Sequence, residues 1–474
     1  HPAAIRRSLL FRKDFQLPAC AIRRARAYVT AKGLYELHLN GQRVGDALLT
    51  PGVVPAPCGA PHASSQVLYY QTYDLAPYLR DGENVIGAIT GNGWYASQGY
   101  NTSRTAKNEL CAYLRIELCS GELVELGTDS TWRVMVSPIT ENDLQWGERY
   151  DARLELPGWD LPEADLTVWS SAEELPAPSY PVKAQPFESI KAAEILEPVK
   201  TERRGKAVLY DFGKNISGRA RLTLTGPKRG QAVSLRYGER MDQDGALIGG
   251  PYHDVFYAKD TWQGDIAGWG ARNVDCYICH GDRQEEYMPR FAYTGFRYVE
   301  VEGCDDPQQA TVQAVVFHTA LEDAGGFICS NELINGIYGI VKNSFEGNLH
   351  YGPTDCPTRE KNFWNGDAAV FIDSALWLKE GGHFWREWTT FGRKIYSDAA
   401  AWWDEDYITP WNLYLFYGDR RALEDNYDKI KADAERRLQS CQDGVYQYPG
   451  LGFNGDHAPP LGCANMDPAL FNSV

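Results

Sequence analysis

The segment from residue 354 to residue 367 holds the densest group of chemically capable side chains in the sequence. Five of them can act on a sugar, namely Asp355, Arg359, Glu360, Trp364 and Asp367. Hydrolysis of a glycosidic bond needs such a set, because one carboxylic acid protonates the leaving oxygen while a second carboxylate activates water or attacks the anomeric carbon. Further carboxylates bind sugar hydroxyls, and a tryptophan offers a stacking face. The segment therefore indicates a glycosidase site, although Glu360 beside Arg359 and Lys361 is also compatible with a surface ion pair.

The local structure of this segment is open to two interpretations. A helix would place Glu360, Trp364 and Asp367 on one face, because they are spaced by four and three residues. Asn365 and Gly366 instead favour a loop over part of the segment. Either structure brings the carboxylates into one neighbourhood beside an aromatic ring.

The composition is that of a multidomain globular protein with an acidic surface. The 474 residues correspond to about three domains, and 43% hydrophobic and 23% charged residues are close to the globular average. The net charge of −16 argues against a nucleic-acid partner, and no run of apolar residues is long enough to indicate a membrane span. The 14 Trp and 28 Tyr suit sugar rings, although strands of β-rich domains use aromatic residues anyway.

Short strands are expected through the first two thirds of the chain. Alternating apolar and polar residues lead into Asn40-Gly41, which is typical of a hairpin turn, and no helix is expected before residue 190. The same alternation continues at 221–225, 233–237 and 299–302. The spacing predicts two β-sandwich (jelly-roll-like) domains, one at residues 1–195 and one at residues 196–320.

Helical periodicity replaces this alternation after about residue 325. Helices are expected at 333–345, 368–379, 384–396, 411–417 and 423–434. Ser330 is the expected N-cap of the first, and Gly381-Gly382 is expected to end the second. Residues 321–474 are therefore predicted to form a third domain that contains only helices and loops.

Two motifs that resemble cofactor or metal sites are better explained as ordinary structure. Cys276-Tyr-Ile-Cys279-His280 has the spelling of a haem attachment site, but it lies in strand-like sequence without supporting context. Asp242-Gln-Asp244-Gly245 resembles the start of a calcium loop, yet His253 stands where a bidentate Glu is needed. No cofactor or metal is expected.

The 11 cysteines are spread thinly, which indicates reduced thiols in a cytoplasmic protein. Because the sequence begins with His1 and not with Met, secretion stays open.

The segment Asp355-Cys-Pro-Thr-Arg-Glu-Lys361, followed by Trp364-Asn-Gly-Asp367, resembles the signature of bacterial α-L-rhamnosidases, glycoside hydrolase family 78. The resemblance extends in collinear order over nearly the whole chain, through Leu39–Asp46, Gly91–Tyr95, Pro289–Val299, Trp403-Asp404 and Tyr417–Asp419. It implies two N-terminal β-sandwich domains followed by part of an (α/α)₆ barrel. It also implies removal of terminal α-linked L-rhamnose with inversion.

The resemblance also implies a role for six side chains. Glu360 falls at the position of the family's general acid. The others are implied to bind the sugar, Asp355 and Asp367 through its hydroxyls, Trp364 and Trp403 as aromatic walls, and Arg359 by orienting the set. Trp403 is equally compatible with a barrel-core residue.

Two positions depart from the family pattern. Phe363 stands where many relatives have Gly, which would narrow the pocket or shift the loop, and Gly455-Asp456-His457 stands where relatives commonly have Gly-Asp-Trp.

The family's general base is a Glu late in the barrel, beyond any motif found here. A twelve-helix barrel needs at least about 200 residues, more than residues 321–474 provide. We therefore expect the base beyond residue 474, little hydrolysis by the chain alone, and uncovered helix faces that favour association with a missing C-terminal portion or a second copy.

The expected partners are rhamnose-containing glycosides or oligosaccharides. Two alternatives stay open, a non-catalytic carbohydrate-binding protein on the same scaffold and another (α/α)₆ glycosidase specificity. The presence of Asp355, Glu360 and Asp367 favours an enzyme over a binding protein, since a binding module needs no general acid.

Overall fold

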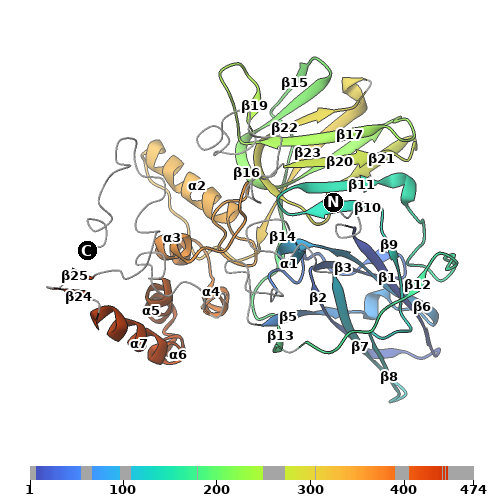
Figure 1. Ribbon diagram of the computed structural model, residues 1–474, viewed down its shortest axis with the longest axis horizontal. Helices are drawn as coiled ribbons and strands as arrows, with labels where there is room; N and C mark the ends of the chain where they lie inside the picture. Colours follow the sequence, from blue (N-terminus) through green and yellow to red (C-terminus); the bar gives the residue numbers. More distant parts are fainter. Residues whose placement is uncertain are drawn as a thin grey trace. The chain divides into compact units, whose positions relative to one another are not determined.

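The computed structural model describes residues 7–54, 67–96, 108–178, 180–248, 273–304, 306–389, 405–439, 441–442 and 445–446 (Figure 1). Trp403 and Gly455-Asp456-His457, which the sequence singles out, lie outside these residues. The chain divides into two compact units. The first, here called the β unit, comprises residues 1–320, 340–351 and 356–362, and the second, the helical unit, comprises residues 321–339, 352–355 and 363–474.

The N-terminal strands of the β unit form two sheets that enclose one core. The first has the order β12 (Ser170–Ser171), β9 (Arg133–Val136), β1 (Leu9–Leu17), β6 (Gly82–Gly91), β3 (Leu34–Leu39), β4 (Gln42–Arg43). The second has the order β13 (Val182–Ala184), β5 (Leu68–Asp74), β2 (Ile22–Lys32), β7 (Glu109–Leu118), β8 (Leu123–Gly127). Leu37 and Ile86 of the first sheet share a buried cluster with Ala27 and Leu114 of the second, which confirms a sandwich.

The local turns of this sandwich follow the sequence except at one place. Asn40 and Gly41 have φ values of 51° and 80°, as the expected hairpin turn between β3 and β4 requires. A short helix, α1 (Gly93–Ala96), contradicts the expectation of no helix before residue 190. It forms where Gly93 at φ 54° redirects the chain after β6 and buries Trp94 and Tyr95. Single 3₁₀ turns lie at η2 (Ala76–Tyr78), η3 (Ala152–Leu154) and η4 (Pro307–Gln309).

Most of the remaining strands of the β unit form one ten-stranded sheet. Its main path is β10 (Ile139–Asp143), β11 (Gly147–Asp151), β20 (Val274–Ile278), β17 (Ala232–Gly238), β22 (Thr294–Glu302), β16 (Ala207–Thr225), β23 (Ala310–Thr319), β14 (Ile190–Leu196). β15 (Lys200–Arg204) and β21 (Gln284–Tyr287) pair with β16, and β18 (Arg240–Met241) pairs with β19 (Leu247–Ile248). Strands β10, β11 and β14, which begin before residue 196, also belong to this sheet. The domain boundary between residues 195 and 196 stays a prediction.

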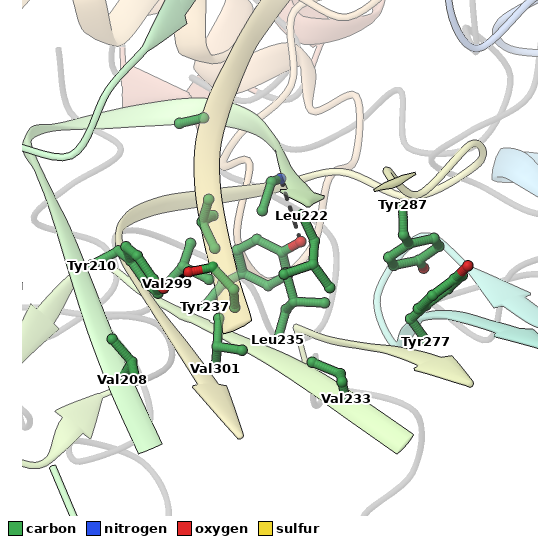
Figure 2. Packing of buried hydrophobic residues seen from close by; sticks show 14 of the residues in the cluster. Val208, Tyr210, Leu222, Val233, Leu235, Tyr237, Tyr277, Tyr287, Val299 and Val301 are labelled. Carbon is green, nitrogen blue, oxygen red and sulfur yellow. Dashed lines mark hydrogen bonds between the residues drawn. The ribbon is translucent and has the colours of Figure 1, made fainter. Parts of the chain in front are cut away.

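The long strand β16 organises the core of this sheet. Its register against β22 shifts between Asp211 and Ile216, and the strand continues beyond the shift to pair with β23 and β21. Figure 2 shows the apolar side chains that the sheet gathers, among them Val208 and Leu222 from the two parts of β16. The haem-like motif belongs to this structure, because Cys276 lies in β20 and Cys279 is buried in the same core.

The helical unit contains α3 (Asn365–Leu378), α4 (Gly382–Trp388), α5 (Glu405–Tyr417), α6 (Arg420–Glu424) and α7 (Tyr427–Gln439), and α2 (Glu332–Gly347) begins in it. α5 packs against α3, α4 and α6.

Three details correct the sequence analysis. Asn331 caps α2 in place of Ser330, since its Oδ1 accepts from the backbone N–H groups of Leu333 and Ile334 at 3.0 and 3.3 Å. The expected helix at 423–434 is split between α6 and α7. Residues expected to be loop form a hairpin of β24 (Cys441–Gln442) and β25 (Val445–Tyr446).

Apolar side chains on these helices are open to solvent. Val370 and Trp377 of α3 are 87% and 72% exposed, and Leu333 of α2 is 73% exposed. These side chains are exposed apolar positions on the described helices. The expected association with a missing portion or a second copy stays a prediction. None of the described helices has the length and apolar character that a membrane crossing requires.

The buried core of the ten-stranded sheet makes a stability prediction. Leu222→Ala removes a fully buried side chain from β16 and should lower the free energy of unfolding by about 2–5 kcal/mol. Urea unfolding followed by circular dichroism measures it. Leu123→Ala, at a position 41% exposed on β8, is the matched control and should change it by less than about 1 kcal/mol. Equal effects of the two changes would contradict this placement of the core.

Candidate active site

The segment that carries the candidate acid is a loop that leads into α3. Residues 356–364 contain turns and no helix, and α3 begins at Asn365 with Trp364 as its N-cap residue. The helical alternative for Glu360 is therefore wrong, while Asn365 and Gly366 mark the start of the helix and not part of the loop. The backbone N–H of Lys361 donates to Cys356 O at 3.1 Å and closes the loop on itself.

Arg359 and Glu360 are brought together in this loop. The Arg359 guanidinium donates to Glu360 Oε1, and the Glu360 side chain is only 8% exposed. A carboxylate this deeply placed needs a partner, because an isolated buried charge is strongly unfavourable. This pair is therefore a buried feature of the site and not the surface ion pair that the sequence left open.

The N-terminal sandwich and the ten-stranded sheet are here called the two β regions. Side chains from both regions hold the loop through hydrogen bonds to its backbone. Trp94 Nε1 donates to Lys361 O at 2.8 Å, and Gln145 Nε2 donates to Glu360 O at 3.0 Å. Asn273 Nδ2 donates to Thr358 O at 3.0 Å. These donors come from α1, from the turn between β10 and β11, and from the residue before β20, so the β unit determines the path of the loop.

Lys361 is the most deeply buried charged side chain of the loop. It is 1% exposed, and its Nζ donates to Tyr293 O at 2.5 Å and to Leu144 O. Burial lowers the pKa of Lys361 to about 8, against the opposing attraction of Asp143. Its backbone φ of 56° lies in the left-handed region, which is uncommon for a residue with a side chain.

Two buried carboxylates lie in the ten-stranded sheet near this lysine. Burial, followed by the charge of Asp275, raises the pKa of Glu148 to about 7. Burial raises the pKa of Asp275 to about 6, although hydrogen bonding from Tyr237 and attraction by Lys361 act in the opposite direction. Asp275 accepts from Tyr237 OH at 2.6 Å and from the backbone N–H of Glu148 at 2.7 Å. The two groups are thus tied into one network.

The other described candidates belong to the helical unit. Asp355, Trp364 and Asp367 are all partly buried, and Asp367 lies in the first turn of α3, where a carboxylate complements the helix dipole. The backbone N–H of Ala368 donates to Trp364 O at 3.2 Å, which fixes the Trp364 backbone at the helix entrance.

Phe363, where the sequence predicts a departure from the family pattern, packs into the interior of the helical unit. It is 6% exposed, its ring centroid lies 6.1 Å from that of Trp388, and a Cβ on Gly352 would lie 2.6 Å from its ring. Gly352 therefore leaves the space that the ring fills.

Five residues in these contacts were given no role by the sequence reasoning. Trp94, Gln145, Asn273 and Lys361 act on the loop, and Glu405 is a buried carboxylate at the start of α5 that accepts from Asn365 Nδ2 at 3.3 Å. Three of them had a sequence signal, because Trp94 and Lys361 stood inside recognised segments and Glu405 directly after Trp403-Asp404. Gln145 and Asn273 had none, because only the fold brings them to the loop. Among the described residues, no three His, Cys, Asp or Glu side chains are grouped to hold a metal ion.

Comparison with known families covers nearly the whole chain. Residues 20–194 match the α-L-rhamnosidase N-terminal domain, residues 201–318 the bacterial α-L-rhamnosidase concanavalin-like domain, and residues 322–460 the bacterial α-L-rhamnosidase six-hairpin glycosidase domain. This order of domains is that of a glycoside hydrolase built from two β regions and a helical region.

Individual relatives match over most of the chain. An α-L-rhamnosidase of Streptomyces avermitilis is 31% identical over 467 residues, which cover 93% of this chain and 43% of the relative. One of Formosa agariphila is 29% identical over 475 residues, with 92% and 47% covered. The chain spans about half the length of the curated relatives it matches.

Solved structures of α-L-rhamnosidases also match nearly the whole of this chain. The Streptomyces avermitilis α-L-rhamnosidase complexed with L-rhamnose gives a TM-score of 0.85 at 28% identity, covering 98% of this chain and 45% of that one. The Dictyoglomus thermophilum α-L-rhamnosidase gives 0.83 at 30% identity, covering 98% and 52%. The chain belongs to the bacterial α-L-rhamnosidase family, and the fold class predicted from the sequence is confirmed.

The buried carboxylates predict a pH dependence of stability. The pKa of Glu148 is higher in the folded than in the unfolded chain, so unfolding releases a proton between about pH 4.5 and pH 7, and stability falls as pH rises through this range. Glu148→Gln should remove roughly 2 kcal/mol of the difference in unfolding free energy between pH 5 and pH 7.5.

Urea unfolding at the two pH values measures this difference. Glu141→Gln, at an exposed position on the neighbouring strand β10, should leave it unchanged. An unaltered pH dependence in Glu148→Gln would show that Glu148 does not hold its proton in the folded state.

Proposed function

We propose that this chain provides the acid side of an α-L-rhamnosidase active site and acts in the hydrolysis of terminal α-linked L-rhamnose with inversion. The observation that carries the proposal is the placement of Glu360, a buried glutamate in the family signature, on a loop that six side-chain or backbone groups hold in place. A general acid needs such fixed placement, because its carboxyl group must lie within hydrogen-bond distance of the glycosidic oxygen and point toward it.

In this proposal each candidate side chain has a distinct task. Glu360 protonates the leaving oxygen, and Arg359 orients the Glu360 carboxyl group. Asp355 and Asp367 accept hydrogen bonds from rhamnose hydroxyls, and charged acceptors make these bonds stronger than neutral ones. Trp364 offers its ring to an apolar face of the sugar. Trp403 is proposed as a second aromatic wall.

The proposed partners are glycosides or oligosaccharides that end in rhamnose. Support comes from the family and from the relative of Streptomyces avermitilis whose structure is described as complexed with L-rhamnose. The mixture of carboxylates and aromatic rings suits a sugar, which presents hydroxyls at its edge and C–H groups on its faces.

Replacing Glu360 by Gln tests the acid role. We expect release of phenol from phenyl α-L-rhamnoside to fall about 100- to 10,000-fold, because this poor leaving group needs a proton. Release from 2,4-dinitrophenyl α-L-rhamnoside should fall much less, since that aryloxide leaves without one. Initial rates are measured with and without sodium azide, which attacks the anomeric carbon directly and makes the assay independent of a protein base.

The control for this experiment is Glu380→Gln, an exposed position between α3 and α4. It should leave both rates unchanged. Equal losses on the two substrates would remove Glu360 from the acid role. Rhamnose binding without Glu360-dependent release from either substrate would favour the non-catalytic binding protein, and faster release from other aryl glycosides would favour another specificity.

Replacing Asp367 by Asn tests the sugar-binding role. Loss of a charge-assisted hydrogen bond should raise the Kd for L-rhamnose roughly 10- to 100-fold, measured by isothermal titration calorimetry. Asp373→Asn, at an exposed position of the same helix, is the matched control and should leave the Kd unchanged. An unchanged Kd in Asp367→Asn would contradict its proposed contact with the sugar.

A further inference from the structure

We propose that Lys361 is a positioning residue for Glu360, and that with Trp94 and Gln145 it forms a clamp through which both β regions fix the acid loop. The catalytic part of this inference rests on the proposed function, in which Glu360 is the acid. The clamp itself rests only on contacts within the β unit. It makes the β regions part of the catalytic apparatus and not appended sugar-binding modules.

The side chain of Lys361 joins two regions that are far apart in the sequence. Its ammonium group donates to Leu144 O, in the turn between β10 and β11, and to Tyr293 O, directly before β22. The Tyr293 ring centroid lies 5.1 Å from Nζ, which adds a cation–π contact. An ammonium group has three directed donors, so these contacts define the position of the lysine in more than one direction.

The backbone of Glu360 and Lys361 is also held, and here the loop carbonyls accept hydrogen bonds from side chains of the β unit. Trp94 Nε1 donates to Lys361 O, and Gln145 Nε2 donates to Glu360 O. The turn that supplies Gln145 is itself fixed, because Asp143 Oδ1 accepts from the backbone N–H groups of Gln145 and Trp146 at 2.9 and 3.2 Å. Glu360 and Lys361 therefore receive hydrogen bonds at both carbonyls while the lysine donates at its end.

The backbone conformation shows that these contacts act together. Lys361 has a φ of 56°, which a lysine adopts only where surrounding contacts over-determine the chain. Glu360 precedes it directly, so a relaxation of Lys361 would rotate the peptide that carries the acid. A displacement of about 1 Å at a catalytic group lowers the rate on the order of 100-fold.

Hydrogen–deuterium exchange of the native chain tests the clamp directly. Lys361→Met keeps the aliphatic stem and removes the ammonium, and Trp94→Phe keeps a buried ring and removes one N–H donor. We expect exchange in the peptide covering residues 356–362 to rise at least tenfold in each variant.

The matched controls are Lys379→Met and Trp132→Phe. Lys379 is also buried but pairs with Asp323, and Trp132 is also buried but donates to Gly127 O. Exchange at 356–362 should stay at the native rate in both.

The catalytic consequence is tested by comparing kcat/KM for substrates with poor and good leaving groups. If Lys361 and Trp94 act by positioning the acid, Trp94→Phe should lower kcat/KM at least tenfold for phenyl α-L-rhamnoside, and much less for 2,4-dinitrophenyl α-L-rhamnoside, with or without azide. A purely structural role would lower both equally, because it reduces the amount of folded protein.

The outcomes separate the inference from the proposed function. Native exchange at 356–362 in both variants overturns the clamp, whatever the activity. Faster exchange with an unchanged ratio between the two substrates overturns the positioning role. A native chain that releases neither aglycone, even with azide, overturns the proposed function, and exchange then decides the clamp alone. If Lys361→Met does not fold, Trp94→Phe, which loses a single donor, decides the result.

Discussion

The loop that bears Glu360 depends on the burial of one ammonium group. A lysine that is 1% exposed must find polar partners inside the protein, because an unpaired buried charge is strongly unfavourable. Lys361 finds two backbone carbonyls, one beside β10 and β11 and one beside β22. Those strands belong to one ten-stranded sheet, so correct pairing of the sheet is a condition for burying the lysine. The contacts that hold the loop bearing Glu360 therefore require the paired sheet.

This constraint explains how a short segment is divided between two compact units. Residues 356–362 group with the β unit, whereas residues 352–355 and the chain from 363 onward group with the helical unit. Seven consecutive residues that contain Arg359, Glu360 and Lys361 are thus built into the β structure, although the sequence signature runs on without interruption to Asp367. A single sequence motif here serves two structural units, and the placement of Glu360 depends on the β unit.

Sequence reasoning reached the family, the fold class and the motif, because these depend on local patterns. The hairpin at Asn40-Gly41 and the strand around Cys276 follow from turn chemistry and alternation. It failed where distant contacts decide the structure. Trp94 and Gln145 lie more than 200 residues before Lys361, and nothing in their own neighbourhoods indicates a bond to the loop. The cap at Asn331 was missed because a side-chain bond to the backbone, and not periodicity, determines where α2 begins.

The packing of Phe363 shows that adjacent parts of one segment are ordered by different contacts. Its side chain packs against Trp388 in the helical unit, and Gly352 provides the space because a Cβ there would collide with the ring. The loop at residues 356–362, which directly precedes Phe363, is held by hydrogen bonds from Trp94, Gln145 and Asn273 of the β unit. Because the two sets of contacts are separate, a change in the packing of Phe363 and a change in the β unit act on different parts of the segment.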